Sequence, residues 1–303
     1  MIRFLGFCIV IGFVVGLGVS LTVFSLEGKS TALRLSSGQV HSGQGERLTP
    51  RPEADRPLDG TPKPSPTPIP DPYLGESGQT TQVRIPILFY HYIGNNPIPE
   101  DTARDTLSVT PDRFKEHMEY LSQEGYTTLT FDMVNDILKG SQSLPAKPVV
   151  LTFDDGYIDF YYNAYPILEQ FSFKATVFVP TGLVGGGAYL TWEMIGQMAG
   201  TGIEFQSHTV NHAYLPSLSR TRMVEEVTES KKTLEERLGH PVNWFAYPYG
   251  AISGSSAKAV KEAGYAGAVG TIPGVNQSAG QMFNLRRQRI GANMDLETFK
   301  TKL

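Results

Sequence analysis

The fold of this chain is decided by one stretch near its middle, Lys147-Pro148-Val149-Val150-Leu151-Thr152-Phe153-Asp154-Asp155-Gly156. The apolar residues behind the proline are typical of a short strand in a parallel sheet that is covered on both faces. Two adjacent carboxylates and a glycine follow the strand. Adjacent carboxylates repel each other, and burying them without compensation is costly. The pattern therefore fits either an ordinary turn or a site where a cation or a substrate proton offsets the charge.

The composition is that of a globular protein. The chain has 303 residues, of which 40% are hydrophobic and 18% charged. It can therefore hold one sizeable domain with appendages, or two small domains. The net charge of −4 and the lack of a basic stripe or recognition motif argue against a nucleic-acid partner. The only cysteine, Cys8, lies in the N-terminal apolar run, so we expect neither disulfides nor thiol chemistry in the folded part.

The first 26 residues have the pattern of a membrane anchor. After Arg3, residues 4–26 form an almost uninterrupted apolar run, and about 20 such residues span a bilayer. A cleaved signal peptide usually has a shorter apolar region and a small-residue cleavage site. We therefore predict an uncleaved transmembrane signal-anchor over residues 1–26, with a cleaved signal peptide as the alternative. Arg3 favours a single-pass protein of the cell membrane whose C-terminal part lies outside the cytoplasm.

Residues 27–83 form a second region with a distinct composition. They are rich in Ser, Gly, Thr and Pro, with seven prolines between Pro57 and Pro72. Such a segment cannot form a packed core, and its composition favours a disordered, partly extended tether. We therefore place the folded domain at residues 84–303.

From residue 84 onward, strand-like apolar runs alternate with amphipathic helical patterns. We expect strands near residues 85–90, 126–129, 147–151, 174–179, 203–207, 244–247, 266–269 and 289–291. Helices are expected at residues 110–124, 131–139, 160–171, 191–199, 220–238 and 255–263. This alternation indicates an α/β fold with a parallel sheet, and about seven to eight strands favour a closed (β/α) barrel. In such barrels, catalytic residues lie at the C-terminal ends of the strands.

Residues suited to metal chemistry follow two of these strands. Asp154 and Asp155 follow one, and His208 and His212 follow another. Two imidazoles and a carboxylate are ligands for a divalent metal, most commonly Zn²⁺, although Co²⁺, Ni²⁺ or Mn²⁺ also suit them. Three ligands leave a position for water, and zinc lowers the pKa of a bound water to about 7. The other carboxylate could then accept the proton of that water.

These residues resemble a known family. The resemblance rests on three segments, Thr152-Phe153-Asp154-Asp155-Gly156, Ser207-His208-Thr209-Val210-Asn211-His212 and Tyr247-Pro248-Tyr249-Gly250. They are similar to the motifs of the polysaccharide deacetylases, the NodB-homology domain of carbohydrate esterase family four. The resemblance extends from residue 85 to the C-terminus. It implies a distorted (β/α) barrel, often with seven strands, that removes acetyl groups from N- or O-acetylated polysaccharides.

The resemblance also implies roles for individual residues. Asp154 would be the general base, and the backbone N–H of Tyr249 would help to stabilise the oxyanion. The metal ligands would be Asp155, His208 and His212. We expect further substrate contacts in the sugar groove, because aromatic faces suit pyranose rings; the candidates are Tyr247, Pro248, Tyr249 and Trp192.

The chain departs from the family pattern at two positions. Many members carry an arginine that orients the base two residues before the proline of the third motif, but this chain has Ala246 there. Arg286, Arg287 or Arg289 could take its place, and we prefer Arg289 because it begins the last expected strand. Many members also carry a late histidine that protonates the leaving amine, whereas no histidine follows His240 here.

His91 offers a replacement for that late histidine. Leu88-Phe89-Tyr90-His91-Tyr92-Ile93 resembles the opening of the circularly permuted poly-N-acetylglucosamine deacetylase branch, where the acid lies on the N-terminal side. The first and last strands of a closed barrel are neighbours, so the residue can keep its place in space. His91 would act as the catalytic acid. By contrast, His117 lies inside an expected helix, and we expect it at the surface.

The sequence therefore predicts a membrane-tethered, metal-dependent hydrolase that deacetylates an extracellular or cell-envelope polysaccharide. The alternative is a catalytically silent carbohydrate-binding protein on the same barrel, which the missing arginine at Ala246 leaves open. A metal phosphohydrolase would need further ligands for a two-metal site. Peptidoglycan, chitin-like oligomers and poly-N-acetylglucosamine all fit as substrates.

Overall fold

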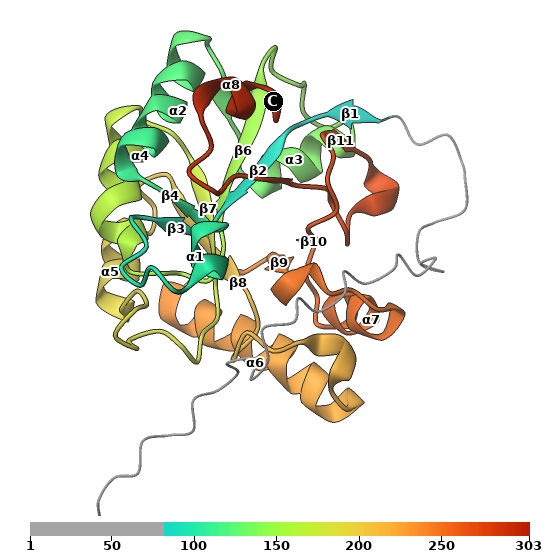
Figure 1. Cartoon of the computed structure of the whole chain (residues 1–303). Helices are drawn as coiled ribbons and strands as arrows, with labels where there is room; N and C mark the ends of the chain where they lie inside the picture. Colours follow the sequence, from blue (N-terminus) through green and yellow to red (C-terminus); the bar gives the residue numbers. More distant parts are fainter. Residues whose placement is uncertain (1–81) are drawn as a thin grey trace, which may run out of the picture. The chain divides into compact units, whose positions relative to one another are not determined.

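The computed structural model describes residues 82–303 (Figure 1). The predicted signal-anchor at residues 1–26 and nearly all of the predicted tether lie outside these residues. Within residues 82–303, no helix combines the length and the apolar character that crossing a membrane requires.

The centre of the domain is a parallel sheet of eight strands. Seven of them follow one another along the sheet in the order β10 (Gly267–Val269), β9 (Trp244–Ala246), β8 (Ile203–Ser207), β7 (Ala175–Val179), β6 (Pro148–Phe153), β2 (Ile87–Tyr90) and β12 (Gln288–Arg289). The eighth, β5 (Thr127–Thr128), pairs with the first two residues of β6. Neighbouring strands run parallel throughout. The predicted α/β class with a parallel sheet is confirmed.

The two ends of the curled sheet meet through an irregular segment. A single bridge joins Val269 to Leu285. The backbone N–H of Ala268 donates to the carbonyl of Met282 at 2.8 Å, and that of Gly270 donates to the carbonyl of Leu285 at 3.2 Å. The segment then continues into β12. The expected closed ring is therefore replaced, between β10 and β12, by scattered hydrogen bonds without a regular ladder.

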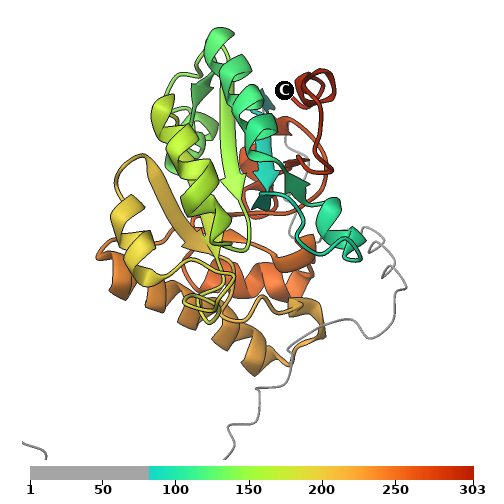
Figure 2. The same cartoon turned by 60° about the vertical axis from the view of Figure 1, so that its left-hand side comes forward.

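Helices cover the outer face of the sheet (Figures 1 and 2). They are α2 (Pro111–Gln123), α4 (Tyr165–Gln170), α5 (Trp192–Met198), α6 (Arg220–Leu238) and α7 (Gly254–Glu262). Local sequence explains their ends. The Thr110 side chain caps the first turn of α2, with Pro111 at the first helical position. Gly239 ends α6 with a left-handed φ of 74°.

The inside of the curl is filled by apolar side chains and closed by one helix. Phe131, Val134 and Ile137 of α3 (Phe131–Leu138) belong to one buried cluster with strand residues from around the sheet. The Phe131 and Trp244 rings stack with centroids 4.8 Å apart. The interior is thus a packed core, so the chemistry is confined to the ends of the strands.

Several short elements lie outside the predicted pattern. They are β1 (Val83–Arg84), β3 (Tyr92–Ile93), α1 (Thr102–Asp105), β4 (Ser108–Val109), β11 (Asn276–Gln277) and α8 (Leu296–Lys300). β3 pairs with β4, and β1 pairs with β11. The helix expected at residues 160–171 begins as a π-helical turn over Phe160–Ala164 before α4. These elements are too short to produce a periodic signal.

The expectation that His117 lies at the surface is wrong. Its side chain is fully buried between α2 and the C-terminal segment. One ring nitrogen, Nε2, bonds the carbonyl of Met294 at 3.0 Å, and the ring stacks on Phe299 at 4.0 Å. The other nitrogen, Nδ1, faces the Tyr90 hydroxyl at 3.5 Å. Phe299 belongs to α8, which was not predicted and which lies beside α2 (Figure 1).

Candidate active site

The residues singled out by their positions at strand ends converge in the structure. Asp154 and Asp155 follow β6, His208 follows β8, and Tyr247 follows β9. Because neighbouring strands are parallel, their C-terminal ends lie at one edge of the sheet. The backbone N–H of Asp154 donates to the Tyr90 carbonyl at 3.0 Å, which holds the carboxylate pair beside His91 and the end of β2.

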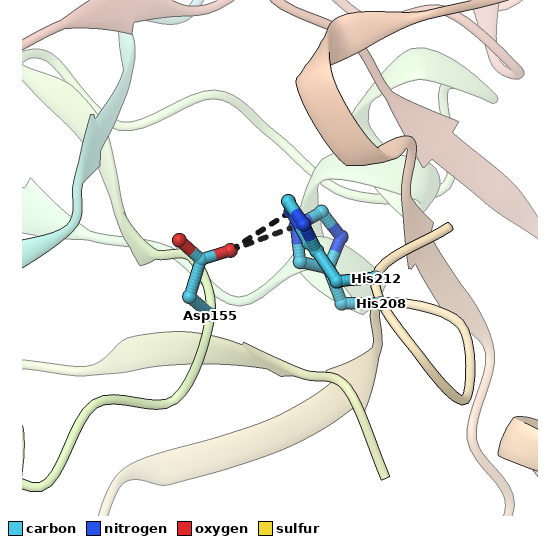
Figure 3. A group of neighbouring side chains, drawn as sticks. All are labelled: Asp155, His208 and His212. Carbon is cyan, nitrogen blue, oxygen red and sulfur yellow. Dashed lines mark ion pairs between the residues drawn. The ribbon is translucent and has the colours of Figure 1, made fainter. Parts of the chain in front are cut away.

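Three of these side chains form a compact cluster (Figure 3). Asp155 Oδ1 lies 3.3 Å from His208 Nε2 and 3.1 Å from His212 Nε2. The three ligand atoms lie within 4.8 Å of one another and could hold a metal ion. The predicted ligand residues are thus brought together, from the end of β6 and from the loop after β8.

The hydrogen bonds of the cluster fit a cation. His208 Nδ1 lies 2.7 Å from the carbonyl oxygen of Ala246, which can only accept, so Nδ1 carries the proton. In the neutral imidazole, Nε2 then presents a lone pair to Asp155 Oδ1, which is buried without a hydrogen-bond donor. Two acceptors facing each other are favourable with a metal ion between them. Burial alone would raise the pKa of Asp155; hydrogen bonds and charge from His208 and His212 hold that pKa well below its ordinary value when their rings are protonated, and a cation in the cluster would act in the same direction.

The backbone at the site is held in left-handed conformations. Asp155, Thr209, His212 and Tyr249 have φ values of 72°, 69°, 54° and 60°. Residues other than glycine adopt such values at a cost, and they do so mainly where the surroundings enforce them, often at functional sites. All four residues belong to the three motifs on which the family resemblance rests.

Asp154 has a different partner from Asp155. The guanidinium of Arg287 donates to both of its carboxylate oxygens, at 2.8 and 2.7 Å. The same guanidinium donates to the carbonyl of Gly270 at 2.7 Å and lies 4.4 Å from the Phe89 ring. Burial would raise the pKa of Asp154, but the charge and hydrogen bonds of Arg287 keep that pKa below its ordinary value. Asp154 is therefore a buried, oriented carboxylate.

The choice of Arg289 as the arginine that orients Asp154 is corrected by this geometry. Arg289 is exposed, and its guanidinium lies over the Phe89 ring at 5.6 Å. Arg287 is fully buried and makes the bidentate contact. It precedes β12, on the irregular segment that completes the curl. The three candidate arginines lie within four residues, and no strand pattern distinguished which of them points inward.

His91 lies at the end of β2, as expected. Its Nδ1 is buried without a hydrogen-bond partner, and its ring lies 5.8 Å from that of Phe89. Burial lowers the pKa of His91 below its ordinary value, and the negative charges of Asp155 and Asp154 oppose that shift without reversing it. His91 thus lies close to both carboxylates, and it is this position, not its pKa, that suits an acid near the reacting bond.

The aromatic residues predicted to contact substrate occupy unlike positions. Tyr249 is 57% exposed, and its ring lies 4.6 Å from that of His212. Tyr247 and Pro248 are buried, and the Tyr247 ring packs on Phe245 at 5.2 Å. Because both residues are buried, the prediction that they contact a sugar is corrected. They support the turn that carries Tyr249. Trp192 packs between α5 and α6 with the Arg237 guanidinium 5.2 Å from its ring, which favours a packing role.

A row of stacked side chains beside the carboxylates was not predicted. The Arg104 guanidinium lies 4.0 Å from the Tyr92 ring, Tyr92 stacks on Tyr157 at 3.8 Å, and Tyr157 stacks on Tyr189 at 5.3 Å. Burial and the charge of Asp155 raise the pKa of Tyr157 and of Tyr189. Their phenols therefore stay protonated near neutral pH. Four separate segments contribute to this row, and no sequence spacing connects them.

Comparison with known proteins agrees with this geometry. Residues 141–268 match the polysaccharide deacetylase family. The Bacillus subtilis protein YxkH, whose name is "putative polysaccharide deacetylase", is 33% identical over 216 residues, covering 71% of this chain and 75% of YxkH. The chain belongs to the polysaccharide deacetylase family. The deacetylase is also similar to the poly-β-1,6-N-acetyl-D-glucosamine N-deacetylase of Escherichia coli K12, at 28% identity over 67% of this chain and 37% of that protein. This chain spans little more than a third of the length of the Escherichia coli protein.

A solved structure supports both the fold and the assignment. A Streptococcus pyogenes deacetylase, PplD, solved in complex with acetate, is 37% identical, with a TM-score of 0.68 over 73% of this chain and 99% of that one. The resemblance inferred from the three motifs and from His91 is confirmed, because the relatives include poly-β-1,6-N-acetyl-D-glucosamine N-deacetylases. The protein is therefore a polysaccharide deacetylase.

Proposed function

We propose that this deacetylase is a metal-dependent hydrolase that removes N-acetyl groups from an N-acetylglucosamine-type polysaccharide of the cell envelope or extracellular matrix. The observation that carries the proposal is the division of labour between two adjacent carboxylates. Asp155 faces two imidazole nitrogens, whereas Asp154 is clamped by Arg287. One carboxylate is thus placed for a cation and the other for a proton.

Asp155, His208 and His212 would hold the metal ion, most commonly Zn²⁺ for such a set, with Co²⁺, Ni²⁺ or Mn²⁺ also suited to it. A bound divalent ion supplies a lowered water pKa and polarisation of the acetyl carbonyl. Ala246 fixes the tautomer of His208 through its backbone carbonyl, so the ligand nitrogen is presented without a proton.

Asp154 would act as the general base. The low pKa imposed by Arg287 keeps it ionised, and the bidentate contact fixes the plane of its carboxylate. It would accept a proton from the attacking water as the water oxygen bonds to the acetyl carbon. A carboxylate with a low pKa is a weak base, so its contribution depends on orientation as much as on basicity.

His91 and Tyr249 would act on the other atoms of the amide. His91 would donate a proton to the sugar nitrogen as the carbon–nitrogen bond breaks, leaving a free amine and acetate. The exposed Tyr249 lies next to His212, and its backbone N–H would stabilise the charge that develops on the carbonyl oxygen. The left-handed backbone of Tyr249, with a φ of 60°, would set the direction of this N–H.

The substrate class is supported by the relatives. The Escherichia coli and Staphylococcus aureus proteins that the chain resembles are named for poly-β-1,6-N-acetyl-D-glucosamine. The apolar run at residues 4–26 and the Pro-rich segment after it support an enzyme tethered to the membrane outside the cytoplasm. The alternative of a catalytically silent binding protein is disfavoured, because the base, its arginine and the ligand cluster are all present.

Two isosteric variants test the division of labour. Asp154→Asn should keep the metal and lose turnover by about 10²- to 10⁴-fold, because proton transfer and one contact to Arg287 are lost while the three ligand residues are unchanged. Asp155→Asn should lose metal and turnover together, because a ligand is removed. Metal per chain after dialysis and acetate release are measured on both. Equal loss of metal in the two variants, or normal turnover of Asp154→Asn, would contradict the proposed roles.

A further inference from the structure

Glu226 makes a set of contacts that the proposed chemistry does not use. It lies on α6 with its side chain 4% exposed. Its Oε2 accepts from the backbone N–H of Val210 at 2.9 Å and of Asn211 at 2.8 Å. Its Oε1 accepts from the side-chain amide of Asn211 at 2.7 Å. One buried carboxylate thus binds two consecutive residues of the loop that separates His208 from His212.

The loop between His208 and His212 needs a hydrogen-bond acceptor for its N–H groups. Its backbone is strained, and its carbonyl groups are already bonded to another loop. Thr209 and His212 have left-handed φ values on either side of the two residues that Glu226 binds. From the opposite direction, the N–H groups of Thr181 and Gly182 donate to the carbonyls of Thr209 and Val210, at 3.1 and 2.7 Å. The carbonyls therefore face the loop after β7, and the N–H groups face Glu226.

We propose that Glu226 is a positioning residue for the metal centre: it holds the loop in the conformation that brings His212 beside His208 and Asp155. The inference rests on the proposed metal-dependent function and adds a residue behind the ligands. Partners of this kind typically change metal affinity by about 10- to 100-fold when they are removed. Glu226 would act on the histidine spacing through the backbone and not through the imidazole rings.

The chemistry of the contact explains why a carboxylate is needed. The three groups that hydrogen-bond to Glu226 are all donors, and the Arg222 guanidinium also lies 3.8 Å from Oε1. An ionised carboxylate is the side chain that only accepts. Glu226→Gln keeps the shape but turns one acceptor into a donor. Its remaining oxygen can still accept from the two backbone N–H groups, while the new amide then faces the amide of Asn211. Adding Asn211→Asp gives that new donor an acceptor.

This exchange supplies a test by double-mutant cycle. The full chain is prepared as wild type, Glu226→Gln, Asn211→Asp and the double variant, and the dissociation constant for Zn²⁺ is measured by competition with a chromophoric chelator. Each single variant should bind Zn²⁺ about 10- to 100-fold more weakly. The double variant should recover most of that loss. The melting temperature of the chelator-treated protein is recorded alongside.

Glu235→Gln is the matched control, because Glu235 also lies on α6 and accepts a backbone N–H, from Val242 at 3.0 Å. Its side chain is 35% exposed, so the variant should lower thermal stability less than Glu226→Gln does, and it should leave Zn²⁺ affinity unchanged. Wild-type affinity in Glu226→Gln, a loss no greater than in the control, or a double variant no better than the singles would overturn the positioning role. If the wild type bound no divalent metal, the metal-dependent function would fail and the inference with it.

Discussion

At the scale of single residues, function depends on two neighbours with the same side chain and different surroundings. Asp154 and Asp155 are both buried, and burial alone would raise the pKa of each. The guanidinium of Arg287 lowers the pKa of the first, and two histidines lower that of the second. The motif predicts that such a difference exists. The partner of Asp154 depends on a chain segment about 130 residues away, which no local pattern reveals.

The arginine contact leads to a first prediction. Arg287→Lys keeps a positive charge but cannot make the bidentate contact with Asp154, so turnover should fall by at least about 10-fold with metal content unchanged. In Arg287→Ala, turnover should fall by at least about 10²-fold. This variant should also lose about 3–5 kcal/mol of stability, because a buried carboxylate is left unpaired. Turnover, metal content and urea denaturation are the measurements.

Arg289→Ala is the matched control for that experiment. Its guanidinium is exposed and contacts the same Phe89 ring without reaching Asp154 in the structure. Its turnover should stay close to that of the wild type. Should the two alanine variants lose equal activity, the assignment of Arg287 as the orienting arginine would be wrong.

A second prediction concerns His91 as the acid. His91→Ala should lower turnover on an acetylated amino sugar by about 10²- to 10⁴-fold and leave metal content intact. The loss should be much smaller on an activated ester such as p-nitrophenyl acetate, whose leaving group needs no proton. The exposed His240→Ala serves as control. If His91→Ala lost equal activity on the amide and on the ester, the assignment of His91 as the acid would be wrong.

At the scale of elements, sequence patterns performed best where they were long. The helix expected at residues 220–238 is found as α6 with those bounds, because a serine cap and a terminal glycine mark its ends. The strand before Asp154 was expected from its unbroken apolar run. The sequence pattern did not predict α8, because its five residues carry no periodicity. The packing of Phe299 on His117 was therefore not predicted either. Tertiary packing, and not helix position, decided the burial of that histidine.

The buried histidine between α2 and α8 leads to a third prediction. Burial lowers the pKa of His117 to about 4, although the Met294 carbonyl opposes the shift. The folded-state pKa lies below the unfolded value near 6.5, so the stabilisation is complete above about pH 6.5 and is lost as pH falls toward 4. The effect is on the order of 3 kcal/mol at most.

His117→Gln should flatten this dependence, because the amide keeps polar partners and does not titrate. The free energy of unfolding is measured in urea at several pH values between 7 and 4 for wild type, His117→Gln and His240→Gln. The wild type and the exposed control should lose stability together as pH falls, and His117→Gln should lose less. Parallel curves for all three proteins would show that His117 does not contribute.

At the scale of the whole molecule, the described residues 82–303 contain the proposed base with its arginine, the proposed acid and the candidate ligand cluster. The predicted parallel α/β architecture positions them at one edge of the sheet, as the order of strands required. Sequence alone could not predict that an irregular segment joins the two ends of the curled sheet and places Arg287 against Asp154. That segment has neither strand nor helix periodicity. The anchor and tether expected before residue 82 remain a prediction about where the enzyme works.

The central claim is that this protein is a metal-dependent polysaccharide N-deacetylase, and acetate release tests it most directly. The full chain is assayed on β-1,6- and β-1,4-linked N-acetylglucosamine oligomers and on an O-acetylated glycan. Each assay is run as purified, after chelator, and after chelator with Zn²⁺ restored. We predict acetate release from N-acetylglucosamine oligomers, its loss with chelator and its recovery with Zn²⁺. Acetate release that persists at full rate after the metal has been removed would contradict the account.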